Sequence, residues 1–139
     1  MYLIINTTPA DKVEIILAKT KDDFKLKVMP GERKQSEKLL AGIDSFLTAN
    51  KLKFDKLKGI GVVSGLGRFT SIRIGVTIAN VLAYGLEIPV VGIETGEYGD
   101  NYQQLTEKVI IRLNRAKPGK VISPVYDAEP NITKAKPRK

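Results

Sequence analysis

The chain has 139 residues and a formal net charge of +8, and 42% of its residues are hydrophobic. These values are typical of one globular domain and exclude a disordered chain. Because the chain contains no His and no Cys, His-dependent triads, Cys nucleophiles, zinc sites made of these residues and disulfide bonds are excluded. No apolar run approaches the ~20 residues of a membrane span, and the first residues lack a signal-peptide pattern. We therefore expect a cytoplasmic protein with no membrane partner.

The first part of the chain predicts three strands. Tyr2–Asn6 is a β-prone run that ends at the turn signal Thr7–Pro9, and the runs Val13–Ala18 and Phe24–Met29 are joined by a polar turn. Apolar residues and lysines alternate in the third run, which favours a strand near the sheet edge with one face in water. We expect these strands to form an antiparallel meander.

Helices and strands then alternate. Apolar residues follow helical spacing in Arg33–Asn50 and again in about Thr70–Gly85. Between these helices, Ile60–Ser64 is apolar without alternation, as in a central strand that is buried on both faces. A fifth strand is predicted at Val90–Ile93.

The last segment permits two interpretations. Leu105, Val109 and Leu113 have helical spacing within Asn101–Asn114, yet residues 105–113 could also form a strand; we favour the helix. We expect a folded lobe over residues 1–127 and a basic, extended or disordered tail over residues 128–139.

The predicted fold class is α/β, with a mixed five-stranded sheet. Its element order is β-β-β-α-β-α-β, followed by a C-terminal helix and the tail. A meander followed by parallel crossovers is the order of a single ribonuclease-H-like or actin-like (ASKHA) lobe. Fold alone does not assign a function.

The second helix carries more apolar surface than one sheet contact needs. Ser71, Gly75, Ala79 and Ala83 recur every four residues and would let another backbone approach closely. A helix buried inside the chain would show the same pattern, so both interpretations stay open. The partner interface that we predict consists of Leu39, Leu40, Ile43, Ile72, Gly75, Val76, Ala79 and Ala83.

Two turns could form a remnant nucleotide loop. Asn6, Thr7 and Thr8 follow the first strand, and Gly65 and Gly67 lie between the fourth strand and the second helix, whose N-terminus could bind an anion. A tight structural turn explains the glycines equally well. Nucleases and phosphotransferases of this fold need an acid at the end of the first strand, where an Asn brings no charge to a metal. We therefore expect no catalytic residue and no metal site in this chain.

The positive charge is concentrated near the C-terminus. Arg112–Lys139 contains eight basic and two acidic residues. Such an arm favours nucleic acid or an acidic partner, although a solvated tail is an equal alternative. The residues at its end are Lys134, Lys136, Arg138 and Lys139.

Several motifs resemble one family in the same order along the chain. The segment GVVSGLGRFTSIRIG, followed by IPVVGIET, resembles the most characteristic stretch of TsaB (YeaZ-like) proteins. LIINTT, QSEKLLAGIDSFL, LKFDKLKGIGVV and ISPVYDAEPNITKAKP resemble further motifs of that family. The chain differs from the family pattern at Asn6, Gln35, Leu66–Arg68 and Ser71, and it resembles a shortened, single-lobe form.

The resemblance implies a non-catalytic subunit. TsaB proteins support a TsaD-type catalytic subunit, with a TsaE-type ATPase, in the threonylcarbamoyladenosine (t6A) modification of tRNA next to the anticodon. ATP and a divalent metal would then bind in partner subunits, and this chain alone would hold no cofactor. Whether the chain also forms a homodimer stays open. The alternative function is a stand-alone ribonuclease-H-like module for dimerisation or nucleic-acid binding, without catalysis.

Overall fold

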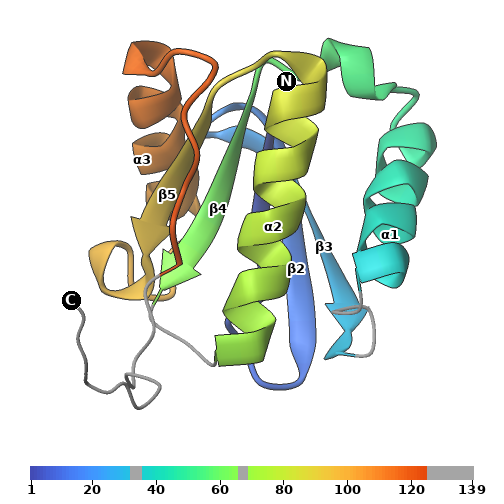
Figure 1. Ribbon diagram of the computed structural model, residues 1–139, viewed down its shortest axis with the longest axis vertical. Helices are drawn as coiled ribbons and strands as arrows, with labels where there is room; N and C mark the ends of the chain where they lie inside the picture. The colour runs from blue at the N-terminus through green and yellow to red at the C-terminus, as the bar shows by residue number, and fades with distance from the viewer. Residues whose placement is uncertain (32–35, 66–68, 125–139) are drawn as a thin grey trace, which may run out of the picture.

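The computed structural model describes residues 1–31, 36–65 and 69–124 (Figure 1). The elements are β1 (Tyr2–Asn6), β2 (Lys12–Thr20), β3 (Asp23–Pro30), α1 (Ser36–Ala49), η2 (Phe54–Lys56), β4 (Gly59–Gly65), α2 (Phe69–Leu86), β5 (Val90–Glu94), η3 (Thr95–Glu97) and α3 (Tyr102–Arg115). The predicted order is confirmed, and residues 105–113 are helical. Outside the described residues lie the predicted tail, Gln35, Gly67 and the cations Lys134, Lys136, Arg138 and Lys139.

The sheet has five strands in the order β3-β2-β1-β4-β5. The first three strands form the predicted antiparallel meander, whereas β4 pairs in parallel with both β1 and β5. In the pairing of β1 with β2, Asn6 lies directly opposite Glu14. The carboxyl ends of β1 and β4 therefore meet at one end of the sheet, together with the start of β2.

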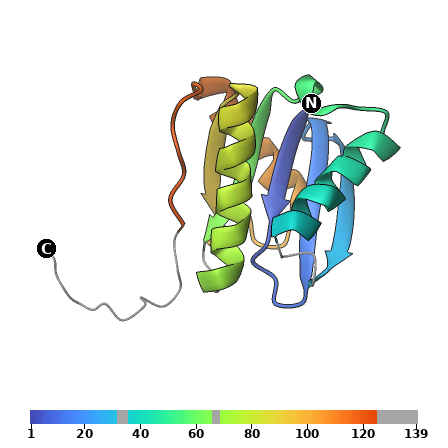
Figure 2. The ribbon, with the colours of Figure 1, turned by 45° about the vertical axis from the view of Figure 1, so that its right-hand side comes forward.

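Helices cover both faces of the sheet (Figures 1 and 2). One core cluster joins α1 and α2 to Leu3, Ile5 and other residues of the first face, and a second joins α3 to Ile4, Ile16 and their neighbours on the opposite face. The two clusters explain why β4 is buried along its whole length, as its unbroken apolar run predicts. Beyond α3, residues 116–124 run back beside α2 (Figure 2).

Two glycines of β4 let α3 approach the sheet closely. A Cβ atom built at Gly61 would lie 2.4 Å from a methyl group of Val109, and one at Gly59 would lie 2.9 Å from a methyl group of Leu113. These separations are far shorter than van der Waals contact distances, so larger residues would displace the helix. The two glycines therefore form the surface of β4 on which α3 packs.

The boundaries of two helices follow from asparagine side chains. Asn50, the predicted end of the first helix, donates from Nδ2 to the carbonyl of Phe46 at 2.8 Å. Asn101 caps α3, because its side chain accepts a hydrogen bond from the backbone N–H of Gln104 at 2.9 Å. Within the three described ranges, no helix is both long and apolar enough to traverse a bilayer.

The predicted partner interface is mostly internal. Leu39, Ile43, Ile72, Gly75, Val76, Ala79 and Ala83 are buried in this chain, so they serve its internal core, and a partner contact through them stays a prediction. The small-residue stripe of α2 faces the sheet, where the backbones of β1 and α2 need room. Leu40 is the member of the predicted set that stays exposed, at 40%.

Candidate functional site

A cleft opens at the carboxyl end of β1, the lower end of the sheet in Figure 1. The connection between β1 and β2 forms one side, and the segment from η3 to the start of α3 forms the other. The cleft has a volume of about 470 Å³. It is lined by Asn6, Thr8, Pro9, Lys12, Glu14, Thr95, Tyr98, Gly99, Asp100 and Tyr102.

Glu14 is the central polar residue of the cleft. It is only 6% exposed, and burial of an isolated carboxylate would be costly. Its Oε1 accepts a hydrogen bond from Asn6 Nδ2 at 3.0 Å, and its Oε2 accepts one from the Tyr102 hydroxyl. The ammonium of Lys12 lies 3.6 Å from Oε2. The charge of Glu14 is thus held by three neighbours within the chain.

Asn6 is equally committed to its surroundings. Besides Glu14, its Nδ2 lies 3.5 Å from the Tyr98 hydroxyl. Its Oδ1 accepts from the backbone N–H of Thr8 at 3.0 Å and from the Thr8 hydroxyl at 2.6 Å. Such a turn closes the loop locally.

The two tyrosines are proton donors throughout the neutral range. Burial, assisted by the Glu14 charge, raises the pKa of Tyr98 to about 12. The hydrogen bond to Glu14 is the main cause that raises the pKa of Tyr102 to about 12. Neither hydroxyl is therefore suited to act as a general base near pH 7.

The predicted nucleotide loop is only partly assembled at this cleft. Asn6 and Thr8 line it, whereas the Thr7 side chain turns toward α2 and donates to the carbonyl of Ser71 at 2.6 Å. Gly65 is buried at the end of β4 and does not line the cleft. Gly67 lies outside the described residues, so its part of the prediction stays a prediction.

Sequence analysis missed the side chains that form the hydrogen-bond network of the cleft with Asn6. Glu14 lies in β2, Tyr98 follows η3 and Tyr102 begins α3, whereas sequence analysis considered an acid only at the end of the first strand. The single acid in the apolar run VEIILA was the available signal. Among the described residues, no group of three or more Asp or Glu side chains is placed to hold a metal, and each Glu14 oxygen accepts a hydrogen bond from within the chain.

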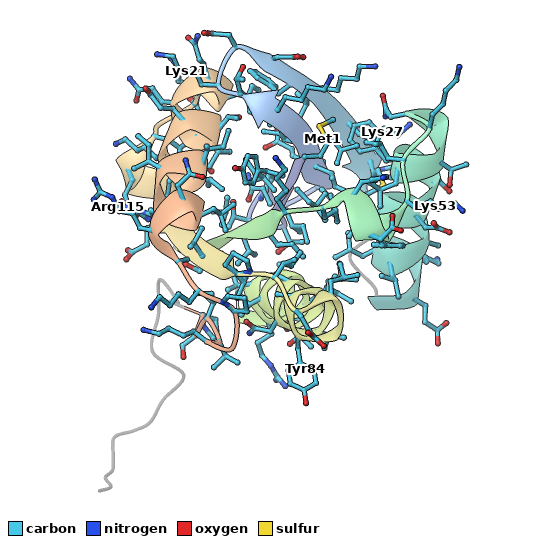
Figure 3. All side chains as sticks on the ribbon, turned by 90° about the horizontal axis from the view of Figure 1, so that it is seen from above. Met1, Lys21, Lys27, Lys53, Tyr84 and Arg115 are labelled. Carbon is cyan, nitrogen blue, oxygen red and sulfur yellow. The ribbon has the colours of Figure 1, made fainter. Side chains whose placement is uncertain are left out.

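A second hollow, the helix groove, lies between α1, η2 and α2. It has a volume of about 520 Å³ and is lined by Glu37, Leu40, Ala41, Asp44, Phe54 and Leu82. On α2, Val81 and Tyr84 are 61% and 84% exposed, and Tyr84 points away from the body of the molecule (Figure 3). This helical face therefore presents apolar side chains to solvent.

Comparison with known proteins assigns the family. The model of the TsaD family, tRNA N6-adenosine threonylcarbamoyltransferase, matches residues 28–122. The chain belongs to this family. Within it, the chain is TsaB-like, which confirms the predicted resemblance.

The curated relatives include both TsaB and TsaD proteins. The chain is 32% identical over 63 residues to the tRNA threonylcarbamoyladenosine biosynthesis protein TsaB of Escherichia coli, covering 45% of this chain and 27% of that protein. It is 34% identical over 64 residues to TsaB of Buchnera aphidicola, covering 46% and 29%. It is 38% identical over 61 residues to the tRNA N6-adenosine threonylcarbamoyltransferase of Geotalea daltonii, covering 44% and 18%. The matches thus span less than a third of these relatives.

A solved structure shares the fold. YeaZ from Pseudomonas aeruginosa superposes with a TM-score of 0.59 at 20% identity, over 67% of this chain and 43% of YeaZ. Together with the TsaD family match, this likeness confirms the predicted actin-like single lobe.

Proposed function

We propose that this TsaB-like chain is a non-catalytic subunit that supports a TsaD-type catalytic subunit in the t6A modification of tRNA in the cytoplasm. Its family model and its TsaB relatives carry tRNA threonylcarbamoyladenosine chemistry in their names, which supports the pathway. In this proposal, ATP and a divalent metal bind in partner subunits, a TsaE-type ATPase belongs to the complex, and tRNA meets the chain within it.

The observation that carries the non-catalytic role is the hydrogen-bond network of the cleft. Glu14, the buried carboxylate of the cleft, already accepts from Asn6 and Tyr102 and lies beside Lys12. A general base or a metal ligand needs lone pairs that can turn to the substrate or ion. The network instead stabilises the junction of β1, β2 and α3, which favours a structural role for this end of the sheet.

The partner surface in this proposal is the exposed face of α1 and α2. Leu40, Val81 and Tyr84 supply apolar area, and Glu37 and Asp44 supply an acidic rim to the helix groove. Apolar centres with polar rims are the usual composition of protein interfaces. The proposed occupant is the TsaD-type subunit; a second copy of this chain and the ATPase are the alternatives that the experiment separates.

The experiment reconstitutes the modification. Purified chain is incubated with tRNA, threonine, bicarbonate, ATP and the adenylate-forming enzyme, with and without a TsaD-type subunit. Modified adenosine should form only when the TsaD-type subunit is present, and this chain should increase its yield. Formation of modified adenosine by this chain and the upstream enzyme alone would contradict the non-catalytic role.

A charge-matched pair of variants tests the surface. Val81→Asp with Tyr84→Asp places two charges on the outer face of α2, whereas Ile111→Asp with Val121→Asp places two charges at exposed positions on α3 and after it. The α2 double variant should no longer co-purify with the TsaD-type subunit, and the control double variant should still do so. An equal loss of co-purification in both double variants would show that the interface lies elsewhere. Light scattering of the chain alone distinguishes a homodimer that uses the same face.

A further inference from the structure

A third hollow, here called the basic hollow, lies at the edge of the sheet between β5, the end of α3 and the segment that follows it. Its volume is about 570 Å³. Among the residues that the structure describes, its lining contains four cationic side chains and no acidic one: Val90, Val91, Gly92, Arg112, Arg115, Ala116, Lys117, Lys120 and Ile122. The cleft at β1, in contrast, is lined by both signs of charge.

The inner wall of the basic hollow is held by Arg112. Its Nη1 donates to the carbonyl of Gly92 in β5 at 2.8 Å, and its guanidinium forms an ion pair with Glu97. The hydrogen bond from Arg112 also lowers the pKa of the Glu97 carboxyl below its ordinary value. Arg112 is therefore an internal brace, and its charge is already compensated.

The outer wall is held by Asn80 of α2. Asn80 Nδ2 donates to the carbonyl of Ile122 at 2.9 Å, and Asn80 Oδ1 accepts from the N–H of Ile122 at 2.9 Å. The Ile122 side chain lies over Gly92, where an added Cβ would come within 3.0 Å of it. The segment that carries Lys117 and Lys120 is thus attached to both α2 and the sheet.

Three cationic side chains around the hollow are available to bind a ligand. Arg115, Lys117 and Lys120 are exposed, and none forms an ion pair with another side chain that the structure describes. Arg115 lies in the last turn of α3, where it also offsets the negative end of the helix dipole. Lys120 lies beyond the last turn of α3, so an interaction with the helix dipole does not explain its presence there.

We propose that the basic hollow binds the phosphodiester backbone of RNA. Phosphates repeat along RNA, and Arg and Lys side chains contact them without reading the base. No aromatic residue lines the described part of the hollow, so recognition there would depend on charge and shape and not on base stacking. The inference rests on the proposed function only for the choice of tRNA as the RNA.

The test measures binding of the full chain to an unmodified tRNA transcript by fluorescence anisotropy at several salt concentrations. The test variant carries Arg115→Gln, Lys117→Gln and Lys120→Gln. The control carries Lys27→Gln, Lys53→Gln and Lys56→Gln, which remove the same charge from exposed positions; Lys27 and Lys53 lie on the side opposite Arg115 (Figure 3). Because the C-terminal cations are present in both, their contribution cancels.

The test variant should lose at least tenfold in affinity at low salt. Its log–log salt slope should become shallower by about 2 to 3 units, because each lost phosphate contact removes about 0.7–0.9. The control should keep its slope near that of the unchanged chain. Circular dichroism and urea unfolding of both variants verify that the fold is retained.

Several results would overturn the proposal. The first is that the unchanged chain does not bind tRNA at low salt. The second is an equal loss of tRNA affinity in the test and control variants. The third is that the test variant loses binding to a poly-glutamate peptide while it keeps binding to tRNA. The last result would assign the hollow to an acidic protein. The measurement uses this chain alone, so its outcome is independent of whether a TsaD-type subunit pairs with the helical face.

Discussion

The hydroxyl of Thr7 donates a 2.6 Å hydrogen bond to the backbone carbonyl of Ser71. This contact ties the end of β1 to the first turns of α2, and it requires the helix to lie very close to the strand. Gly75, one turn further along α2, provides the space. A Cβ atom at Gly75 would lie 2.5 Å from the Thr7 hydroxyl oxygen.

We predict that Gly75→Ala lowers the free energy of unfolding by about 1–3 kcal/mol, because overpacking separates α2 from β1. Gly85→Ala in the same helix is the control, since a Cβ there would meet nothing within 4 Å. That change should stabilise the chain by about 0.5–1 kcal/mol through the helix propensity of Ala. Urea unfolding of the two variants measures both effects, and equal effects would contradict the close contact.

The tyrosines of the cleft predict a loss of stability at alkaline pH. The pKa values of Tyr98 and Tyr102 are raised from 10.0 to about 12 in the folded chain, so the folded state holds protons that the unfolded state releases. Their stabilising contribution is complete below about pH 10 and disappears as the pH rises toward 12. Tyr102→Phe should flatten the fall in unfolding free energy between these limits. An unchanged slope would show that Tyr102 is not protected in the folded chain.

The two raised pKa values have different main causes, which one substitution separates. Glu14→Gln removes the charged acceptor of the Tyr102 hydroxyl, so the pKa of Tyr102 should fall toward its ordinary value. Tyr98 owes its raised pKa mainly to burial and should change less. Titration of tyrosinate absorbance in Glu14→Gln, and in its combinations with Tyr98→Phe and Tyr102→Phe, assigns each step. A larger change at Tyr98 would contradict the network described for the cleft.

Asn80 should control the order of the segment after α3. Asn80→Ala removes both hydrogen bonds to the Ile122 backbone, so the Ile122 amide should lose most of its protection from hydrogen exchange. Thr77→Ala, at an exposed position of the same helix, is the control and should leave that protection unchanged. Retained protection in Asn80→Ala would mean that packing of Ile122 alone holds the segment.

The order of elements was predictable because each element has its own periodicity. The apolar run of β4 and the spacing of Leu105, Val109 and Leu113 match the structure. The alternation in β3 predicted its edge position correctly, but the expected buried face is open, because Leu26 and Val28 are 37% and 49% exposed. Helical spacing also identified the wide apolar arc of α2. It could not say which neighbour covers each part of the arc, because that depends on how β1, α1 and α2 pack in three dimensions.

The cleft was harder to predict because it depends on register. Asn6 and Glu14 are eight residues apart, and they meet only because β1 and β2 pair with these two residues opposite each other. Tyr102 reaches Glu14 from a helix 88 residues further along the chain. No local pattern encodes either contact, although a buried acid in an apolar strand signals that a partner must exist.

Helix α3 fixes the distance between the cleft at β1 and the basic hollow. It carries Tyr102 in its first turn and Arg115 in its last, and its 14 residues set them about 20 Å apart. Both positions depend on how deeply Val109 and Leu113 settle over Gly61 and Gly59. A methyl group added at Gly61 would therefore shift the tyrosine and the arginine together. A perturbation that starts inside the sheet would thus reach the cleft at β1 and the basic hollow at the same time.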